Sequence, residues 1–159
     1  RVAVVSLGLL CALLLVVIVR MAFIICITIA GIPHGWRCFG SSFYYISTSL
    51  KTWSHSRQHC MNLGGHLVII DSEEEQKFIY GFGKNIWIGL NDIQSEGTWK
   101  WVDDKVLKIA GYWQEGEPND PTASGDEDCV ELLQTSPLRS WNDRGCSAEI
   151  NYICEKQSE

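Results

Sequence analysis

The hydrophobic and polar positions divide the chain into two parts of unequal length. Residues 2–19 are uncharged and almost wholly apolar, and the apolar character continues after Arg20 as far as residue 32. An apolar run of this length is near the lower limit for a helix that spans a bilayer. The pattern therefore predicts a transmembrane anchor over residues 1–32 and one folded domain over residues 33–159.

A cleaved signal peptide is the alternative interpretation of the apolar segment. The segment is longer than the usual hydrophobic region of a signal peptide, and no clear small-x-small motif precedes the domain, so we favour a retained anchor. Arg1 before the span indicates a single-pass type II protein of the plasma membrane, with its C-terminal domain extracellular. Arg20 either ends the span or lies within it, where a cation would seek an acidic partner helix.

The first half of the domain has the periodicity of two helices. Residues 48–65 place Trp53, Cys60 and Leu63 on one helical face and end in a Gly-Gly pair, which favours a left-handed stop. Residues 71–83 predict a second helix, because Ser72 is followed three positions later by a glutamate and the two form a capping box.

The remaining regular segments are short and suit strands. Trp99 and Trp101 fall on one face of an alternating run. The predicted strands are residues 66–70, 87–90, 98–102, 129–133, 140–144 and 151–155. Two helices followed by short antiparallel strands predict an α+β fold. Between Asp103 and Asp128 no periodicity is evident, and an irregular stretch of that length in a compact domain is usually functional or disordered.

The charge of the domain excludes some partners. All 19 acidic residues lie in this part, with 11 of the 13 basic ones, so it carries a net charge of −8. Such a surface repels nucleic acid and anionic lipid. His55 and His59 have a helical metal-ligand spacing, but no HExxH motif and no third ligand accompany them. No catalytic constellation can be assembled, so we predict that the protein is not an enzyme.

The cysteines indicate an oxidising compartment. Two of the seven lie in the apolar segment, and the other five are Cys38, Cys60, Cys129, Cys146 and Cys154. Outside the cell, four of these five can form two disulfides. The spacing alone permits several pairings. A zinc site is disfavoured because no CxxC pair exists.

The stretch EGEPNDPTASGDEDC, residues 115–129, holds six acidic side chains and no basic one. A solvated loop is the commonest fate of such a charge run. Carboxylate and amide oxygens on irregular backbone are, however, what Ca²⁺ requires, since it accepts six to eight oxygen ligands in flexible geometry. Glu117, Asn119 and Glu127 are the candidate ligands, and Asn142 with Asp143 would join them if Cys129 pairs with Cys146.

Several linked motifs resemble a C-type lectin domain. They are WIGL at residues 87–90, the Glu-Pro-Asn at 117–119, the Trp-Asn-Asp at 141–143 and the spacing of the last four cysteines. The resemblance extends from about Trp36 to Glu155. With the N-terminal anchor, the chain is similar to type II lectin receptors of the dendritic-cell mannose-binding and asialoglycoprotein-receptor group, which act in innate immunity.

This resemblance implies a set of site residues. It implies disulfides Cys60–Cys154 and Cys129–Cys146, and a cis bond before Pro118. The principal calcium site, which also binds sugar, would comprise Glu117, Asn119, Glu127, Asn142 and Asp143. The auxiliary calcium site would comprise Asp92, Glu96, Asp120 and Asp128.

The resemblance also implies the ligand. A Glu-Pro-Asn motif accompanies sugars with equatorial 3- and 4-hydroxyls, so we predict glycans of the mannose, fucose and N-acetylglucosamine type, on glycoproteins or microbial surfaces. Carboxylates of Glu117 and Glu127 would accept hydroxyl protons, and the amides of Asn119 and Asn142 would donate. The alternative function is a receptor of the same fold that binds a protein ligand without sugar.

The chain departs from the family at two points. Ile32 and Phe43 stand where longer members have an additional disulfide, and Cys38 matches neither position. We predict that Cys38 carries an unpaired thiol, with an interchain bridge as the alternative. No stalk sequence separates the anchor from the domain, so a homo-oligomer is possible but not indicated by a motif.

Overall fold

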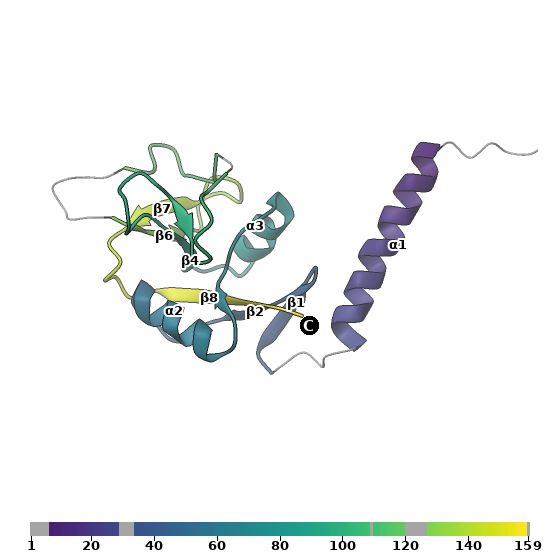
Figure 1. The fold of residues 1–159 in the computed structure, drawn as a ribbon, viewed down its shortest axis with the longest axis horizontal. Helices are drawn as coiled ribbons and strands as arrows, with labels where there is room; N and C mark the ends of the chain where they lie inside the picture. The colour runs from purple at the N-terminus through teal and green to yellow at the C-terminus, as the bar shows by residue number, and fades with distance from the viewer. Residues whose placement is uncertain (1–6, 29–33, 109, 120–126, 159) are drawn as a thin grey trace, which may run out of the picture.

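The computed structural model describes residues 7–28, 34–108, 110–119 and 127–158, with the backbone alone for Leu7 and for residues 19–28. Within these residues, three helices and eight strands follow one another along the chain (Figure 1). The elements are α1 Leu7–Thr28, β1 Trp36–Phe39, β2 Ser42–Ile46, α2 Trp53–Asn62, β3 His66–Leu67, α3 Glu73–Tyr80, β4 Ile86–Asn91, β5 Lys100–Trp101, β6 Cys129–Leu132, β7 Trp141–Arg144 and β8 Asn151–Gln157.

Both predicted domain helices are present and shorter than their sequence patterns. Thr52 caps the first turn of α2, and Gly64 follows the helix with φ of +77°. Gly65 allows a close approach of two backbones, because a Cβ atom there would lie 2.2 Å from the carbonyl oxygen of Glu155. At α3, the hydroxyl of Ser72 accepts the N–H of Glu75 at 3.2 Å, so the Ser72 half of the predicted capping box is confirmed.

The strands form one mixed sheet rather than only antiparallel ones. Its order is β1-β2-β8-β4-β6-β7, with β3 beside β8 and β5 beside β4. Most neighbours are antiparallel, but β4 and β8 run parallel. The expectation of antiparallel sheets alone is therefore wrong. The cause is topological, since β4 and β8 are far apart in sequence and their relative direction depends on the whole intervening path.

The order of elements also differs from the prediction. An antiparallel hairpin of β1 and β2 precedes α2, and β2 pairs along its length with β8. The strands near both ends of the domain are thereby neighbours. Gly40, with φ of +57°, lies in the turn of this hairpin.

The core has two adjoining parts. The larger packs around α3 and the sheet and includes Trp101 and Trp141, whose rings meet edge to face with centroids 5.7 Å apart. The smaller lies under α2 and contains Trp53 and Trp87. In Figure 1 the described parts of the connection between β5 and β6, residues 102–108 and 110–119, lie beyond β6 and β7, on the side away from α2. The irregular segment therefore has a rigid base of buried tryptophans.

Two disulfides brace this base as the resemblance implied. Cys60 and Cys154 join α2 to β8 with their Cα atoms 5.2 Å apart. Cys129 and Cys146 join the start of β6 to the turn after β7, with Cα atoms 5.1 Å apart. On the loop-entropy account, the long closure contributes about 4–5 kcal/mol and the short one about 3 kcal/mol.

Cys38 is disulfide-bonded, so the prediction of an unpaired thiol at this position is wrong. The spacing of the other four domain cysteines carries no signal for this bond. Cys11 on α1, in contrast, is exposed and carries a free thiol.

Helix α1 occupies most of the predicted anchor. Its described side chains, from Gly8 to Ile18, are exposed. Over the part of the chain that the structure describes, no helix combines the length and the apolar character required to cross a membrane. The side chain of Arg20 lies outside the described residues.

Candidate functional site

Three of the predicted principal ligands meet where the acidic loop passes the end of β7. The backbone N–H of Asn119 donates to Oδ1 of Asp143 at 3.2 Å, and the side-chain amide of Asn119 donates to the carboxylate of Glu117. The peptide bond between Glu117 and Pro118 is cis, as predicted. Loop and strand thus bring two carboxylates and one amide together.

Asp143 is the most perturbed group of this cluster. Burial raises the pKa of its carboxyl to about 7, the N–H of Asn119 opposes that shift, and the side chain of Glu117 adds to it. The Asp143 side chain therefore lies in a place where negative charge is disfavoured unless a proton or a cation compensates it. A cation held between Glu117 and Asp143 would supply that compensation.

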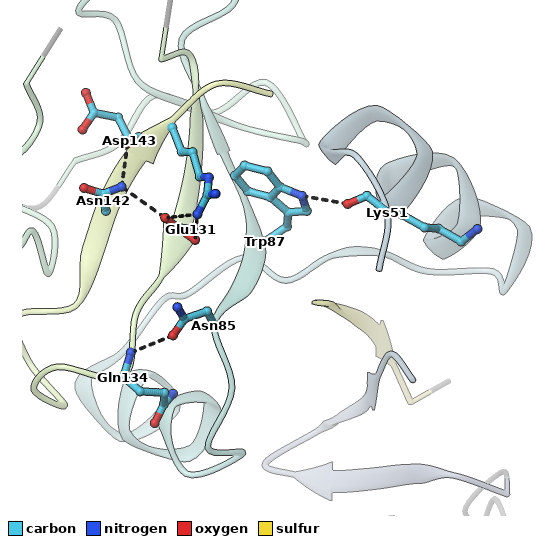
Figure 2. A network of polar contacts seen from close by, with 8 residues as sticks. Lys51, Asn85, Trp87, Glu131, Gln134, Asn142 and Asp143 are labelled. Atoms are coloured by element: carbon cyan, nitrogen blue, oxygen red, sulfur yellow. Dashed lines mark hydrogen bonds and ion pairs between the residues drawn. The ribbon is translucent and has the colours of Figure 1, made fainter. Parts of the chain in front are cut away.

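The neighbouring Asn142 is oriented by contacts inside the sheet. Its side-chain nitrogen donates to Oε1 of Glu131 at 3.2 Å and to the carbonyl oxygen of Asp143 at 2.7 Å. Figure 2 shows this nitrogen turned towards Glu131 and the amide oxygen pointing the opposite way. Asn142 thus presents an oxygen, the atom type a hard cation accepts.

The remaining member of the predicted set, Glu127, is half-buried and lies two residues before β6. The Cys129–Cys146 disulfide ties this position to the turn that follows Asp143. Residues 120–126 are outside the described part of the chain, and the predicted auxiliary ligand Asp120 is among them.

The other three auxiliary ligands form a second cluster. Oxygen atoms of Asp92, Glu96 and Asp128 all lie within 4.8 Å of one another. Burial raises the pKa of Asp92 to about 6, the N–H of Gly97 opposes the shift, and the charges of Glu96 and Asp128 add to it. Three carboxylates at this distance repel each other, and a shared cation would relieve the repulsion.

The donor chemistry of both clusters fits calcium. Their ligand atoms are carboxylate and amide oxygens on loops and strand ends, without sulfur or imidazole. Oδ1 of Asp92 is buried and has no hydrogen-bond partner among the described residues. A buried acceptor of this kind destabilises the fold unless a cation or a hydrogen-bond donor lies against it. A calcium ion at the second cluster would supply that partner to Oδ1 of Asp92.

Two residues of the network were not predicted from the sequence. Glu131 is only 2% exposed, and Nη1 of Arg144 donates to its two carboxylate oxygens at 3.1 and 3.2 Å. The only sequence signal was an acidic residue at an inward position of a short apolar strand. Its partner Arg144 was evident only as part of the predicted strand 140–144.

Two disulfides, a mixed sheet and loops that gather carboxylate and amide oxygens define a cross-linked α+β recognition domain suited to a hard cation. The profile of the family described as Lectin C-type domain matches residues 49–156. The chain belongs to the C-type lectin family, and it is accordingly not an enzyme.

Known relatives extend this comparison. The mouse (Mus musculus) protein C-type lectin domain family 6 member A is 40% identical over 128 residues. The alignment covers 77% of this chain and 59% of that relative, so the chain spans less than two thirds of its relative's length.

Two solved structures are also similar. One is the cow carbohydrate-recognition domain of CD23, determined in the presence of a GlcNAc2Man3 oligosaccharide, with 37% identity and a TM-score of 0.71 over 80% of this chain and 96% of that one. The other is the C-type lectin domain of murine dendritic cell inhibitory receptor 2 in complex with N-glycan, with 34% identity and a TM-score of 0.70 over 79% and 98%.

Proposed function

We propose that the domain binds glycans of the mannose class through a calcium ion held by Glu117, Asn119, Glu127, Asn142 and Asp143. The observation that carries this proposal is the contact of Asn119 with both Glu117 and Asp143. It joins the Glu-Pro-Asn and Trp-Asn-Asp motifs into one oxygen-rich cluster. Asp92, Glu96, Asp120 and Asp128 would hold a second calcium ion that braces the loop.

Calcium bound there would offer coordination positions to two vicinal hydroxyls of a sugar. The protein side chains would complete the hydrogen bonds of those hydroxyls. Glu117 and Glu127 accept protons, and the amide of Asn119 donates. In this structure Asn142 donates to Glu131 and to a backbone carbonyl, so donation to a hydroxyl would require the exchange of one of these bonds.

The preference for mannose, fucose and N-acetylglucosamine rests on the order of amide and carboxylate. Glu117 precedes Asn119, the arrangement that accompanies equatorial 3- and 4-hydroxyls in the family. The two glycan-containing relatives described above support a carbohydrate ligand. The alternative function, a receptor of this fold that binds a protein without sugar, leaves the paired carboxylates of Glu117 and Asp143 without a role.

Titration calorimetry with calcium, followed by sugar binding, tests the proposed function. The folded domain should take up calcium at millimolar concentration or below and then bind immobilised mannose. Soluble mannose should compete, and galactose should not. A well-folded preparation without calcium uptake would refute the proposal, whereas uptake without any sugar binding would favour the protein-binding alternative.

Acidification should release calcium and sugar together. In the metal-free state the pKa of Asp143 is raised to about 7, mainly by burial, and calcium requires the ionised form. Protons therefore compete as the pH falls below 7, and one proton lowers the apparent calcium affinity by up to about tenfold per pH unit. We expect calcium binding at pH 5.5 to be at least about tenfold weaker than at pH 7.5.

The stability of the domain should also change with pH, in opposite directions without and with calcium. Without calcium, the pKa of Asp143 is higher in the folded protein than in the unfolded chain. The protonated carboxyl therefore stabilises the fold at pH values below the unfolded pKa, and this stability is lost as the pH rises through about 7. With saturating calcium the trend should reverse, because ionisation then favours the bound state. Equal calcium affinities at pH 5.5 and pH 7.5 would contradict the expected release of calcium on acidification.

We further propose that residues 1–32 anchor the protein as a single-pass type II receptor of the plasma membrane, with the lectin domain outside the cell. The large apolar side chains exposed on α1, from Leu9 to Ile18, support this proposal. Expressed in cells, the full chain should stay with membranes after carbonate extraction, and its domain should be digested by external protease. Release by carbonate would exclude the anchor.

A further inference from the structure

An ion pair between the buried Glu131 and the partly exposed Arg144 lies next to Asn142, one of the proposed calcium ligands. Strands β6 and β7 are antiparallel, and their register sets Glu131 opposite Asn142. Arg144 is two residues further along β7, so its side chain projects from the same face as that of Asn142. The three side chains therefore form one cluster on a single face of the ladder.

Within this cluster, Arg144 and Asn142 both donate hydrogen bonds to the carboxylate of Glu131. Nη1 of Arg144 lies between the two carboxylate oxygens of Glu131, at 3.1 and 3.2 Å. The same Oε1 atom accepts the side-chain nitrogen of Asn142 at 3.2 Å (Figure 2). Glu131 is buried, whereas the Arg144 side chain is 43% exposed, so the arginine reaches the carboxylate from the solvent side.

This arrangement selects one orientation of the Asn142 amide. A carboxylate paired with arginine offers only acceptors, so the amide group facing it must be the NH₂. The carbonyl oxygen of Asn142 is then held on the opposite side, away from Glu131. A neutral amide at position 131 would lack this selectivity, since it can meet either end of Asn142 with a hydrogen bond.

We infer that Glu131, held by Arg144, is a positioning residue that fixes the amide of Asn142 with its oxygen available for calcium. The inference rests on the proposed function for the identity of the cation. Its geometry is independent of that function, because the contacts of Asn142 with Glu131 and of Glu131 with Arg144 are made by protein atoms alone. Groups that orient a metal ligand in this way typically change metal affinity by about 10- to 100-fold when they are replaced.

The substitution Glu131→Gln tests this inference. It preserves the shape of the side chain and removes the selectivity for the NH₂ group. We expect calcium affinity in titration calorimetry to fall about tenfold. The side-chain ¹⁵N–H signals of Asn142 should lose their protection from hydrogen exchange. Arg144→Gln should have the same effect on both readouts, and Arg144→Lys, which retains the charge, should have a smaller one.

The matched control is Glu73→Gln. Glu73 is also paired with a basic residue, Lys77, but both are half exposed on α3. This variant should retain wild-type calcium affinity and wild-type Asn142 signals. An unchanged calcium affinity of Glu131→Gln would overturn the inference, and so would a lower melting temperature in chelator with no change in affinity, which would make Glu131 a structural brace.

If the proposed calcium-dependent function is wrong, the wild-type chain will take up no calcium at all, which differs from the outcomes above. The hydrogen exchange of the Asn142 amide would still decide whether Glu131 orients this side chain. If the exchange rates of wild type and Glu131→Gln agreed, the positioning role would be refuted without reference to metal.

Discussion

If the domain binds mannose as proposed, the double substitution Glu117→Gln and Asn119→Asp is expected to change its preference to galactose. The side-chain amide of Asn119 donates to the carboxylate of Glu117. The exchange reverses donor and acceptor and preserves the pair, the total charge and the number of oxygen atoms. The hydrogen-bonding pattern presented to the two sugar hydroxyls is therefore reversed while the cation site is conserved.

The expected magnitude follows from the bonds that are exchanged. A hydrogen bond to a charged group contributes roughly 1.5–3 kcal/mol, so a mismatch at one hydroxyl changes relative affinity by about 10- to 100-fold. Glycan-array binding, with mannose and galactose as soluble competitors, measures the ratio. Preference for mannose should be lost and preference for galactose gained.

The two single substitutions serve as controls. Glu117→Gln removes a carboxylate from the cation site and should weaken calcium binding relative to the double variant. Asn119→Asp adds a carboxylate that the cation compensates, so it should retain calcium binding and lose the amide that donates to a sugar hydroxyl. An unchanged mannose preference in a double variant that still binds calcium would refute the assignment of specificity to these two residues.

Local patterns predicted the helices of the domain and their starts. At α3 the cap of Ser72 on Glu75 depends only on residues three apart, so the sequence is sufficient. The carboxylate of Glu75, however, accepts the N–H of Asp71 and the hydroxyl of Tyr44 rather than closing the second half of the capping box. Tyr44 is on β2, and no local rule brings it there.

Features that depend on distant pairing were missed. The hairpin of β1 and β2 has a signal, since Gly40 and Ser41 separate two aromatic runs, but its placement depends on pairing with β8. The parallel pairing of β4 with β8 and the ion pair of Glu131 with Arg144 have no local signature. A buried acid in a strand becomes interpretable only when the register supplies its partner.

The residues of the candidate site could be selected from the sequence because they are concentrated in motifs, and their role as calcium ligands stays a prediction. Asn119 meets Glu117 and Asp143, and three acids of the auxiliary set meet each other, as the resemblance implied. The disulfides of the domain were likewise implied by the spacing typical of the family. Cys38 was predicted wrongly because its pairing is outside that shared spacing.

Asp143→Asn is expected to have opposite effects on the metal-free and the calcium-loaded protein. Without calcium, negative charge at this position is disfavoured, mainly by burial and further by Glu117. Asparagine removes the charge and retains an oxygen that can accept the N–H of Asn119. In chelator at pH 8, the variant should therefore melt higher than the wild type, by roughly 5 °C.

This increase in melting temperature should depend on pH. The pKa of Asp143 in the folded protein is raised to about 7, so the wild-type carboxyl is protonated and neutral at pH 5. The advantage of the variant should accordingly vanish at pH 5 and appear as the pH rises through 7. Asp103→Asn is the control, because Lys105 lowers the pKa of Asp103 against the effect of burial, and its removal should destabilise the protein near neutrality.

With calcium, the Asp143→Asn variant should melt at a lower temperature than the wild type. A ligand at 100 times its dissociation constant stabilises the folded state by about 2.7 kcal/mol, and the variant should lose this contribution from the principal site. Calorimetric scans in chelator and in excess calcium, at pH 5 and pH 8, measure both effects. A variant that melted below the wild type in chelator at pH 8 would show that Asp143 is stabilising without metal, which would remove the electrostatic reason for a cation beside Glu117. The approach of Glu117 to Asp143 would then need another explanation, since a half-buried carboxylate beside a buried one is disfavoured unless a proton or a cation shares the site.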